Sequence, residues 1–467
     1  MQLKAGAHIH LMGICGTAMA SLAGILKDLG YRVTGSDQNV YPPMSTQLQQ
    51  LGIEIMQGYK SGNLSVAGTP DLVVVGNVIT RNHEEAQALL KSDIPYTSLP
   101  KAMGDFVIQN RNSVVLAGTH GKTTMTSMMA WVADVCQKQA GFLVGGIPLN
   151  FQHSFLAPKG NWFIIEGDEY DTAFFDKVPK FIHYKPKYVV ISSLEFDHAD
   201  IYNSLDEIKD AFYQLVKRIP EDGILVYNAD VPPLVELAQK AKCKIVGYGH
   251  QHGDYQICER MMLVGRNHFA VQYRGEKIAD IALKQFGLHN SLNSLAVYAL
   301  AKEMGWNERQ VLQALASFKG VKRRQELLGE PRGVKIFEDF AHHPTAVKMT
   351  LECMKEAYPN NKLFAVFEPR SATSRRAIFQ KEYAQAFGAA DDIIIAPPFD
   401  QSKISEVDRF SSDTLVEDLN KNGRHAQTFS DTDAIAEYIN STSKDGDVVI
   451  VMSNGGFNNI YPKLLQS

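Results

Sequence analysis

The sequence predicts an α/β protein built from three domains: a Rossmann-like N-terminal domain, a central domain with a mixed sheet, and a Rossmann-like C-terminal domain. The chain has 467 residues, about three times the common domain size of roughly 150. Short β-type runs alternate with helical stretches, as in parallel sheets wrapped by helices. This alternation begins again at residue 113 and once more after the basic run 322–324. We therefore expect domains at 1–108, 109–325 and 326–467.

Composition and charge narrow the class of protein. The chain has 47 Lys and Arg and 51 Asp and Glu, for a net charge of −4, so nothing favours a nucleic-acid partner. The N-terminus, MQLKAGAHIHLMGICG, resembles neither a signal peptide nor a membrane span, and we expect no membrane association. The 5 cysteines show no CxxC spacing, so neither disulfides nor a zinc site is expected. A reducing cytoplasm fits these features best.

The first domain opens with a nucleotide-binding layout. Strands are expected at 8–12, 31–34 and 72–75, with a helix at 19–29. A glycine turn, Gly-Ile-Cys-Gly-Thr, separates the first strand from the helix, and Asp37 follows the second strand. This is the dinucleotide-binding layout, in which glycines admit a phosphate and an acid lies near a ribose. The glycines fall as GxxG rather than GxGxxG, so a nicotinamide or flavin is weakly supported and another nucleotide diphosphate remains open.

The second domain begins with the strongest local signal in the chain. An apolar strand at 114–117 runs into Gly118, Thr119, His120, Gly121, Lys122, Thr123 and Thr124, and then into a Met-rich helix. Backbone N–H groups at such a turn suit phosphate oxygens, while the lysine reaches the β/γ-phosphates and the following threonine can hold magnesium. Leu116 stands where the full P-loop pattern expects its first glycine, which leaves a simple glycine-rich helix start as the alternative. We favour an ATP or GTP site.

The rest of the second domain adds polar groups at strand ends. Strands are expected at 162–165, 188–192 and 224–227, an antiparallel stretch at 255–283, and helices at 290–303 and 308–317. Glu166 opens a carboxylate cluster after the first of these strands, and hard oxygen ligands there suit magnesium; a solvated acidic turn is the alternative. His198 follows the next strand, where it can reach a metal or a substrate, although a histidine in a turn is often structural.

The third domain repeats the pattern. Strands are expected at 334–337, 363–367, 393–396 and 448–451. Polar motifs follow three of them, and they contain these residues of interest: Asp339, His342, His343, Arg370, Ser371 and Asn454. Thr345 or the backbone beside it can cap the next helix. Because all three motifs lie at the carboxyl ends of strands, their convergence favours a site.

In order, the segments GTHGKTT, IIEGDEYD, LEFDHAD, HNSLNS, FKGVKRRQE and EDFAHHPT resemble the motif set of the Mur ligases over essentially the whole chain. Those enzymes have three domains, the central one a P-loop ATPase, and use ATP and Mg²⁺ to join an amino acid or peptide to the carboxylate of a UDP-sugar. The segments GICGTAM, EYDTAFFDK, FEPRS and MSNGGF resemble the branch that attaches L-alanyl-γ-D-glutamyl-meso-diaminopimelate to UDP-N-acetylmuramate in murein recycling. The alternative within the family is the L-alanine ligase of peptidoglycan synthesis.

The resemblance implies a role for each matching position. Catalysis would rest on Lys122, Glu166, His198, Arg323 and Arg324, with the metal held by Thr123, Glu166 and His198. ATP would contact Asn290, Asp339, His342 and His343 as well as the loop 118–124. The sugar nucleotide would contact Cys15, Gly16, Thr17, Ser36 and Asp37. For the incoming peptide we add Arg370, Ser371 and Asn454, because a guanidinium can bind a carboxylate through two hydrogen bonds.

Two readings outside the family remain to be separated by experiment. A nicotinamide oxidoreductase would not require Lys122 for its activity, and a nucleotide-sensing module would bind ATP without releasing phosphate. The basic pair at 323–324 also suits a solvated linker. The resemblance further implies a cytoplasmic bacterial enzyme, and we expect a monomer or a weak dimer.

Overall fold

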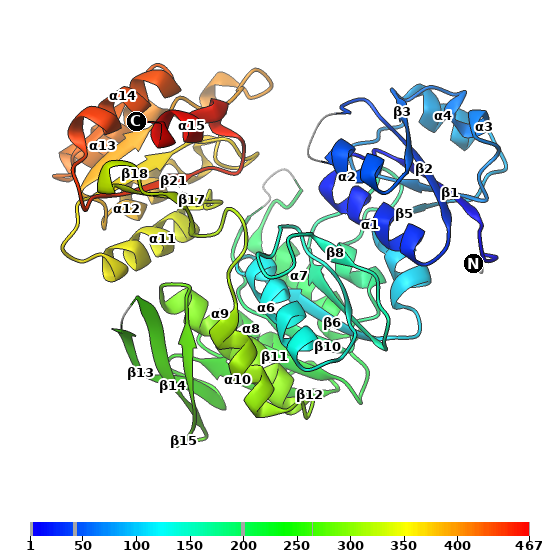
Figure 1. Ribbon diagram of the computed structural model, residues 1–467, viewed down its shortest axis with the longest axis horizontal. Helices are drawn as coiled ribbons and strands as arrows, with labels where there is room; N and C mark the ends of the chain where they lie inside the picture. Colours follow the sequence, from blue (N-terminus) through cyan, green and yellow to red (C-terminus); the bar gives the residue numbers. More distant parts are fainter. Residues whose placement is uncertain (1–2, 41–43, 198–200, 264, 467) are drawn as a thin grey trace. The chain divides into compact units, whose positions relative to one another are not determined.

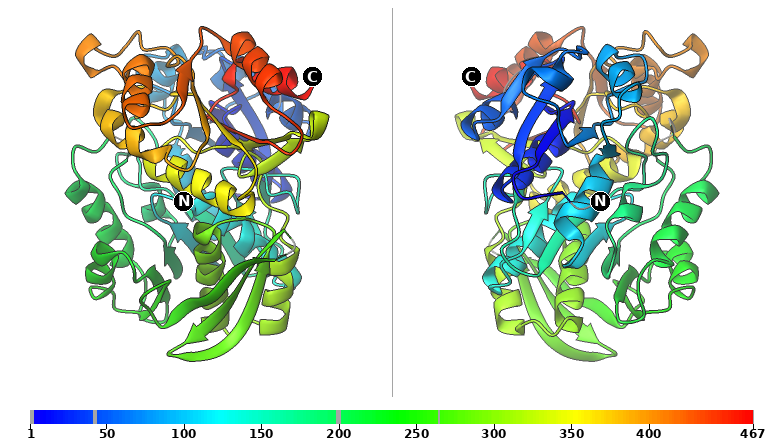
Figure 2. Two further views of the ribbon diagram at one scale, coloured as in Figure 1. Left: turned by 90° about the vertical axis from the view of Figure 1, so that its left-hand side faces the viewer. Right: turned by 90° about the vertical axis from the view of Figure 1, so that its right-hand side faces the viewer.

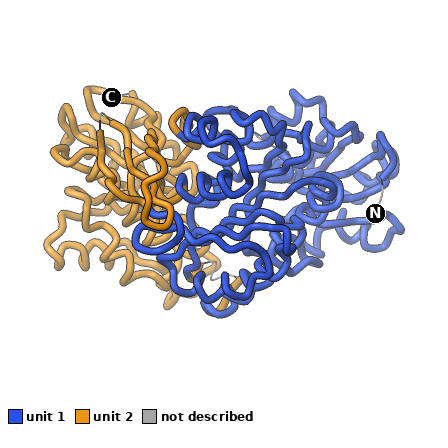
Figure 3. Tube along the Cα trace, turned by 90° about the horizontal axis from the view of Figure 1, so that it is seen from below, with its two compact units in different colours: residues 1–195, 204–256, 294–315 blue, residues 196–203, 257–293, 316–467 orange. Residues whose placement is uncertain are grey.

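The computed structural model (Figure 1) describes residues 3–40, 44–197, 201–263 and 265–466. Its strands form three sheets of five, ten and six strands, which confirms the predicted α/β class. By its internal contacts the chain divides into two compact units (Figure 3), which we describe separately. Unit 1 comprises residues 1–195, 204–256 and 294–315, and unit 2 comprises 196–203, 257–293 and 316–467. The domain limits at 108/109 and 325/326 stay predictions.

The first sheet is wholly parallel and lies in unit 1. Its order is β3-β2-β1-β4-β5, so the winding direction reverses between β1 and β4 and leaves a crevice at their carboxyl ends. All residues of β1 are buried. The elements are β1 (His8–Met12), α1 (Thr17–Asp28), β2 (Arg32–Asp37), α2 (Met44–Gln50), β3 (Glu54–Gln57), α3 (Asn63–Val66), β4 (Leu72–Val75), α4 (Glu84–Leu90), β5 (Tyr96–Ser98), α5 (Leu99–Ala102) and η1 (Met103–Ile108).

The second sheet is mixed, with order β15-β14-β13-β12-β11-β10-β6-β9-β7-β8. Its central strands pair in parallel, while β7 with β8 and β14 with β15 pair antiparallel; β14 and β15 are long green strands in Figures 1 and 2. The strands are β6 (Asn112–Ala117), β7 (Gly141–Leu143), β8 (Phe155–Leu156), β9 (Trp162–Gly167), β10 (Tyr188–Ile191), β11 (Ile224–Asn228), β12 (Lys244–Gly249), β13 (Tyr255–Leu263), β14 (Arg266–Tyr273) and β15 (Glu276–Leu283). The helices are α6 (Lys122–Val135), η2 (Lys180–His183), α7 (Leu205–Val216), α8 (Pro232–Ala238), α9 (Leu288–Glu303) and α10 (Glu308–Ser317).

The third sheet lies in unit 2, with order β16-β17-β21-β18-β19-β20. Only β16 with β17 pairs antiparallel among its described pairs. The elements are β16 (Glu326–Gly329), η3 (Pro331–Gly333), β17 (Lys335–Asp339), α11 (Pro344–Ala357), β18 (Leu363–Phe367), η4 (Ala377–Phe379), α12 (Gln380–Ala386), β19 (Asp392–Ile395), η5 (Glu406–Asp408), α13 (Ser412–Lys421), β20 (Ala426–Thr428), α14 (Thr432–Thr442), β21 (Val448–Met452), η6 (Phe457–Asn459) and α15 (Ile460–Leu465).

Alternation along the strands of the third sheet builds two cores. In β18, Leu363, Ala365 and Phe367 pack in one core with apolar residues of α11, α12 and α13. Phe364 and Val366 pack in the other with residues of α14 and α15. Successive side chains of a strand point to opposite faces of the sheet. Because helices cover both faces, the sequence of β18 is apolar at every position.

All the strands predicted from apolar runs are present, within a few residues of their expected limits. The strands that prediction missed include β3, β5, β16 and β20, which are short strands of 3 or 4 residues. A run this short carries too little periodicity to be recognised. Within the part of the chain that the structure describes, no helix is long and apolar enough to cross a bilayer.

Candidate active site

The loop between β6 and α6 is a backbone cradle built on the end of β10. Gly118 has φ +128°, and a Cβ there would lie 2.3 Å from Ser192 Oγ and 2.9 Å from Ser193 N. His120 N donates to Ser193 Oγ at 2.8 Å, and Ser192 Oγ donates to His120 O at 2.6 Å. Glycine is therefore required at this turn by both its conformation and its neighbours.

The start of α6 is suited to an anion. Gly121 is the N-cap of this helix, with φ +83°, and it has no side chain to accept hydrogen bonds from the first turn. The helix has 14 residues, so its N-terminus carries a partial positive charge that favours phosphate.

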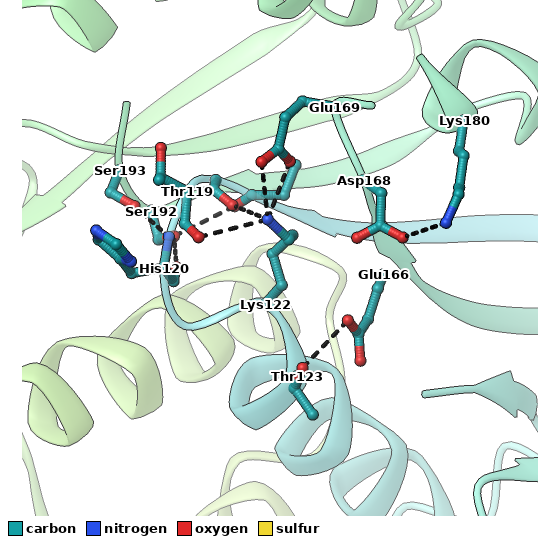
Figure 4. Close-up of polar contacts among 12 residues, drawn as sticks. Thr119, His120, Lys122, Thr123, Glu166, Asp168, Glu169, Lys180, Ser192 and Ser193 are labelled. Carbon is teal, nitrogen blue, oxygen red and sulfur yellow. Dashed lines mark hydrogen bonds and ion pairs between the residues drawn. The ribbon is translucent and has the colours of Figure 1, made fainter. Parts of the chain in front are cut away.

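Lys122 is held by oxygens on two sides (Figure 4). Its Nζ donates to Gly118 O at 2.6 Å and lies 2.9 and 3.2 Å from the two carboxylate oxygens of Glu169. The side chains of this ion pair are 12% and 2% exposed. Burial lowers the pKa of Lys122, but the facing carboxylates of Glu169 and Asp168 raise it by more, so the pKa lies above its ordinary value. The amine is thus a fixed positive charge at the loop.

Thr123 and Glu166 form the second polar pair of the loop. Glu166 lies near the end of β9, the parallel neighbour of β6. Its Oε2 accepts a hydrogen bond from Thr123 Oγ1 at 3.2 Å, and its Oε1 accepts one from Gly145 N at 2.6 Å. A buried carboxylate and a hydroxyl at the first turn of a helix are the hard oxygen donors that magnesium prefers.

Two further predicted residues of the loop, Thr119 and His120, contact the segment after β10. His198 lies outside the described residues. The His120 ring lies 3.3 Å from Glu195 Oε2. Thr119 Oγ1 accepts a hydrogen bond from Glu195 N at 2.9 Å, so this threonine fastens the loop to the segment after β10.

A cavity of about 490 Å³ opens at the carboxyl ends of the first sheet, within unit 1. It lies at the reversal between β1 and β4 and is lined on one side by the glycine turn, including Cys15, Gly16 and Thr17. The strand order of the sheet determines this location, because the crevice forms where neighbouring connections go to opposite faces. From outside the first sheet, Thr172 and Lys180 also line the cavity.

Asp37 lines the cavity and organises its wall. The carboxylate accepts hydrogen bonds from Cys15 N at 2.9 Å, from Asn39 N at 2.9 Å and from Tyr59 Oη at 3.4 Å. Burial, together with the Asp37 charge, raises the pKa of the Cys15 thiol to about 11 and the pKa of Tyr59 to about 12. Both groups are neutral hydrogen-bond donors at neutral pH.

Ser36 does not line the cavity. Its Oγ donates to Glu85 Oε2 at 2.7 Å, within a buried network in which Glu85 Oε1 also lies 2.8 Å from the His10 ring. Side chains alternate along a strand, so Ser36 points away from the opening that its neighbour Asp37 lines. The prediction that Ser36 contacts a ligand is therefore unsupported by this geometry.

In unit 2, Asp339 at the end of β17 is a buried acceptor. Its carboxylate accepts hydrogen bonds from Gln325 N at 2.9 Å and from Ala341 N at 2.8 Å. Burial raises the pKa of Asp339 more than Arg324 and these donors lower it. Asn290, at the start of α9, donates from Nδ2 to Phe286 O at 2.8 Å.

The two arginines of the basic pair differ in their contacts. Arg323 Nε donates to Glu338 Oε1 at 2.6 Å, and its Nη2 donates to Ser453 O and Gly455 O. Both guanidinium groups lie over the ring of Phe340, at 5.1 Å for Arg323 and 4.7 Å for Arg324 from its centroid. Arg323 therefore holds the loop after β21 through hydrogen bonds within unit 2. The interpretation of the basic pair as a solvated linker does not account for these contacts.

The two histidines at the start of α11 both form hydrogen bonds with backbone groups. His343 Nδ1 accepts a hydrogen bond from Thr345 N at 3.3 Å, so the cap of the helix is the His343 side chain and not Thr345, which was expected as an alternative to the backbone beside it. The extended backbone of His343, with φ −94° and ψ 144°, turns its ring back over the first turn of the helix. The ring of His342 bonds to Phe340 O at 3.0 Å.

Arg370 lies beside the loop after β21. Its guanidinium carbon is 3.7 Å from the centroid of Phe399, and its Nη1 donates to the buried Glu368 at 3.2 Å. Ser371 is bonded to Ser374 at 2.9 Å. Asn454 has a buried Oδ1 that accepts no hydrogen bond in the described structure. Arg370 is therefore oriented by an acid and an aromatic face, as a residue that binds a planar anion requires.

Sequence reasoning missed two charged residues of this region, Glu169 and Lys180. Glu169 lies within the predicted acidic cluster, but nothing in its spacing distinguishes it as the partner of Lys122. Lys180 lies 12 residues beyond Asp168, to which its Nζ donates at 3.0 Å. Only the folding of the intervening loop brings this lysine back, so no sequence signal was available to find it.

Comparison with known proteins connects these features. Residues 8–111 match a profile described as the Mur ligase family catalytic domain, residues 116–301 the Mur ligase middle domain, and residues 323–455 the Mur ligase glutamate ligase domain. The chain is 38% identical over 462 residues to UDP-N-acetylmuramate–L-alanyl-gamma-D-glutamyl-meso-2,6-diaminoheptandioate ligase of Escherichia coli K12, covering 98% of this chain and 97% of that protein.

Two further relatives extend the comparison. UDP-N-acetylmuramate–L-alanine ligase of Clostridium acetobutylicum is 32% identical, over 96% of this chain and 95% of its own. The crystal structure of a murein peptide ligase from Psychrobacter arcticus is similar with a TM-score of 0.72 at 36% identity, covering 99% of this chain and 98% of that chain. The chain therefore belongs to the Mur ligase family, whose members are ATP-dependent ligases that form carbon–nitrogen bonds.

Proposed function

We propose that this chain uses ATP to join the tripeptide L-alanyl-γ-D-glutamyl-meso-diaminopimelate to UDP-N-acetylmuramate, in the recycling of murein in the bacterial cytoplasm. The observation that carries the proposal is the loop at β6 and α6, where the ammonium of Lys122 and the Thr123–Glu166 pair surround a helix N-terminus. The choice of substrates is supported by relatives at 38% and 36% identity whose names specify this tripeptide.

The chemistry follows from the poor reactivity of a carboxylate. Transfer of the γ-phosphoryl group to a carboxylate oxygen of UDP-N-acetylmuramate gives an acyl phosphate and ADP. The α-amine of the tripeptide then attacks the carbonyl carbon, the amide forms, the amine loses a proton, and inorganic phosphate leaves. Fixed positive charge at the loop offsets the negative charge that develops on the transferring group, which is the role we propose for Lys122.

The residues present fit a bound magnesium ion. Thr123 Oγ1 and Glu166 Oε2 lie 3.2 Å apart and supply the oxygen donors for it, and we propose His198 as a further ligand. When bound, the ion would neutralise phosphate charge. The glycine at 118, where a Cβ would lie 2.3 Å from Ser192 Oγ, lets the loop pack closely against the end of β10.

We assign the remaining roles from the motif resemblance. Residues 1–108 would bind the sugar nucleotide, through the cavity that Cys15, Gly16, Thr17 and Asp37 line. Residues 109–325 would bind ATP, and residues 326–467 the peptide and part of the nucleotide. The nucleotide contacts proposed outside the loop are Asn290, Arg323, Arg324, Asp339, His342 and His343.

For the amine substrate we propose Arg370 with Ser371 and Asn454. We propose that the guanidinium, held against Phe399 at 3.7 Å, binds a carboxylate of the diaminopimelate residue, which carries two. L-alanine lacks this distant carboxylate, so the arrangement favours the tripeptide over the alternative amine, although relatives at 32% and 31% identity are named for L-alanine.

The test is a panel of amines with ATP and UDP-N-acetylmuramate, measured by ADP release and by mass spectrometry of the product. L-alanine, the dipeptide and the tripeptide are compared at equal concentration. We expect the highest kcat/KM for the tripeptide, with no phosphate release when the sugar nucleotide is omitted. A higher kcat/KM for L-alanine would assign the chain to the other branch, and ATP binding without phosphate release would favour a sensing module.

A further inference from the structure

A lysine outside the predicted site connects the cavity of unit 1 with the phosphate-binding loop. Lys180 begins η2 and lines the cavity of about 490 Å³. Its Nζ donates to Asp168 Oδ2 at 3.0 Å and lies 4.1 Å from the centroid of Tyr170. Both side chains of the ion pair are largely buried, at 14% and 16% exposure. The ammonium therefore has a defined position at the cavity wall.

The surroundings of Lys180 orient its charge. Lys180 N donates to Tyr170 O at 3.2 Å, which holds the lysine backbone against the segment that follows β9. The largely buried carboxylate of Asp168 accepts the hydrogen bond from Lys180, and the charge of Lys122 also acts on it. Asp168 thus separates two ammonium groups, and Figure 4 shows it between them.

The charge balance of the cavity identifies what Lys180 can bind. Of the described residues that line the cavity, Lys180 is the only lysine or arginine, and Asp37 contributes a negative charge. An ammonium has three donors, and Asp168 accepts the one side-chain hydrogen bond that the described structure assigns to it. The other polar groups of the described lining, such as Asn39, Tyr59 and Asn77, are uncharged donors or acceptors apart from Asp37 and His83, so Lys180 is the lysine that an anionic ligand in this cavity can contact.

We propose that Lys180 is a substrate-binding residue that contacts an anionic oxygen of the sugar nucleotide in this cavity, oriented for that contact by Asp168 and Tyr170. The inference rests on the proposed function, since it takes UDP-N-acetylmuramate as the ligand. That ligand has two anionic groups of this chemistry, the diphosphate and the lactyl carboxylate. Lys180 would fix the ligand at the side of the cavity nearest Asp168, two residues from Glu166.

The test compares Lys180→Met, Lys180→Arg and the control Lys177→Met by calorimetric titration. Lys177 lies on the same segment in an exposed ion pair with Asp171 at 2.6 Å, and it does not line the cavity. The probes are UDP-N-acetylmuramate and UDP-N-acetylglucosamine, which has the diphosphate but no lactyl carboxylate. The KM for ATP is measured in parallel.

We expect Lys180→Met to weaken UDP-N-acetylmuramate binding by about 10- to 100-fold, the loss typical of one charge-assisted hydrogen bond. Lys180→Arg should retain most of the affinity, and both Lys177→Met and the KM for ATP should be unchanged. An equal loss for UDP-N-acetylglucosamine assigns the contact to the diphosphate. A loss confined to UDP-N-acetylmuramate assigns it to the carboxylate.

A second measurement needs no variant. UDP-N-acetylmuramate should protect Lys180 of the unaltered protein from reductive methylation, whereas Lys177 should be modified equally with and without it. Wild-type affinity of Lys180→Met for both probes, or an absence of protection at Lys180, overturns the inference while leaving the proposed function intact. A rise in the KM for ATP as large as the loss of sugar-nucleotide affinity would mean that Lys180 only supports Asp168. If the unaltered protein binds neither probe, the proposed function fails together with the inference.

Discussion

Replacing Lys122 by methionine tests the proposed phosphate-binding loop most directly, because it removes the ammonium and keeps most of the side chain. The two carboxylate oxygens of Glu169 lie 2.9 and 3.2 Å from Nζ, and Glu169 is only 2% exposed. The variant therefore leaves a buried carboxylate without the cation that faces it. Removing one partner of a buried ion pair costs about 3–5 kcal/mol of unfolding free energy. Loss of a fixed charge at the transferring phosphoryl group should lower kcat by about 100- to 1000-fold.

A second variant separates these two effects. Lys122→Met combined with Glu169→Gln removes the unmatched charge, so we expect most of the lost stability to return while turnover stays low. Urea unfolding reports the stability and ADP release reports the turnover. The pKa of Lys122 is raised in the folded state. The contribution of the pair is therefore fully present below the unfolded-state pKa of about 10.4 and is lost only as the pH rises through the folded value. Measurements near neutral pH thus capture all of it.

The control is Lys177→Met, whose ion pair with Asp171 involves a lysine that is 65% exposed and should contribute at most about 1 kcal/mol. Full turnover by Lys122→Met would refute the assignment of the loop to phosphate binding. Equal instability of the single and double variants would show that the cost does not arise from the carboxylate of Glu169.

Three further outcomes are expected. Because the pKa of Cys15 is raised from 9.0 to about 11, its alkylation at mildly alkaline pH should be about 100-fold slower than that of an ordinary thiol. Peptide mapping measures this rate, and UDP-N-acetylmuramate should lower it further. An ordinary alkylation rate would contradict a buried thiol that faces Asp37. Gly118→Ala should abolish ADP release, because its Cβ would lie 2.3 Å from Ser192 Oγ. The control Gly275→Ala is also at positive φ but has open space around it, so it should keep wild-type turnover. Equal activities of the two variants would argue against a sterically required glycine at 118. Arg370→Lys keeps the positive charge but loses the planar guanidinium that packs on Phe399. It should therefore raise the KM for the tripeptide about 10-fold and leave the KM for ATP unchanged. An equal rise in the KM for ATP would exclude a role specific to the peptide.

How much of the site was predictable differs between strand ends and connecting loops. Asp37 and Glu166 lie at the carboxyl ends of buried strands, and Lys122 begins the helix after one. Their positions could be anticipated because the carboxyl ends of parallel strands converge on one edge of a sheet, while their roles stay predictions. Ser36 was expected beside Asp37, but alternation along β2 directs it to Glu85, and it does not line the cavity. Thr345 or the backbone beside it was expected as the cap of α11, whereas the extended backbone at 343 makes His343 the N-cap.

By itself, the sequence determined the α/β class, the alternation of strands and helices, the glycine-rich turn between β6 and α6, and the family. These depend on local patterns and on short motifs whose chemistry is carried by neighbouring residues. The tertiary structure alone decided the partners of the charged side chains: Glu169 for Lys122, Asp168 for Lys180 at the cavity, and backbone carbonyls of the loop after β21 for Arg323. Such pairs join residues 12 to 132 positions apart. Their energies depend on burial and distance, which are properties of the folded chain and not of any local pattern.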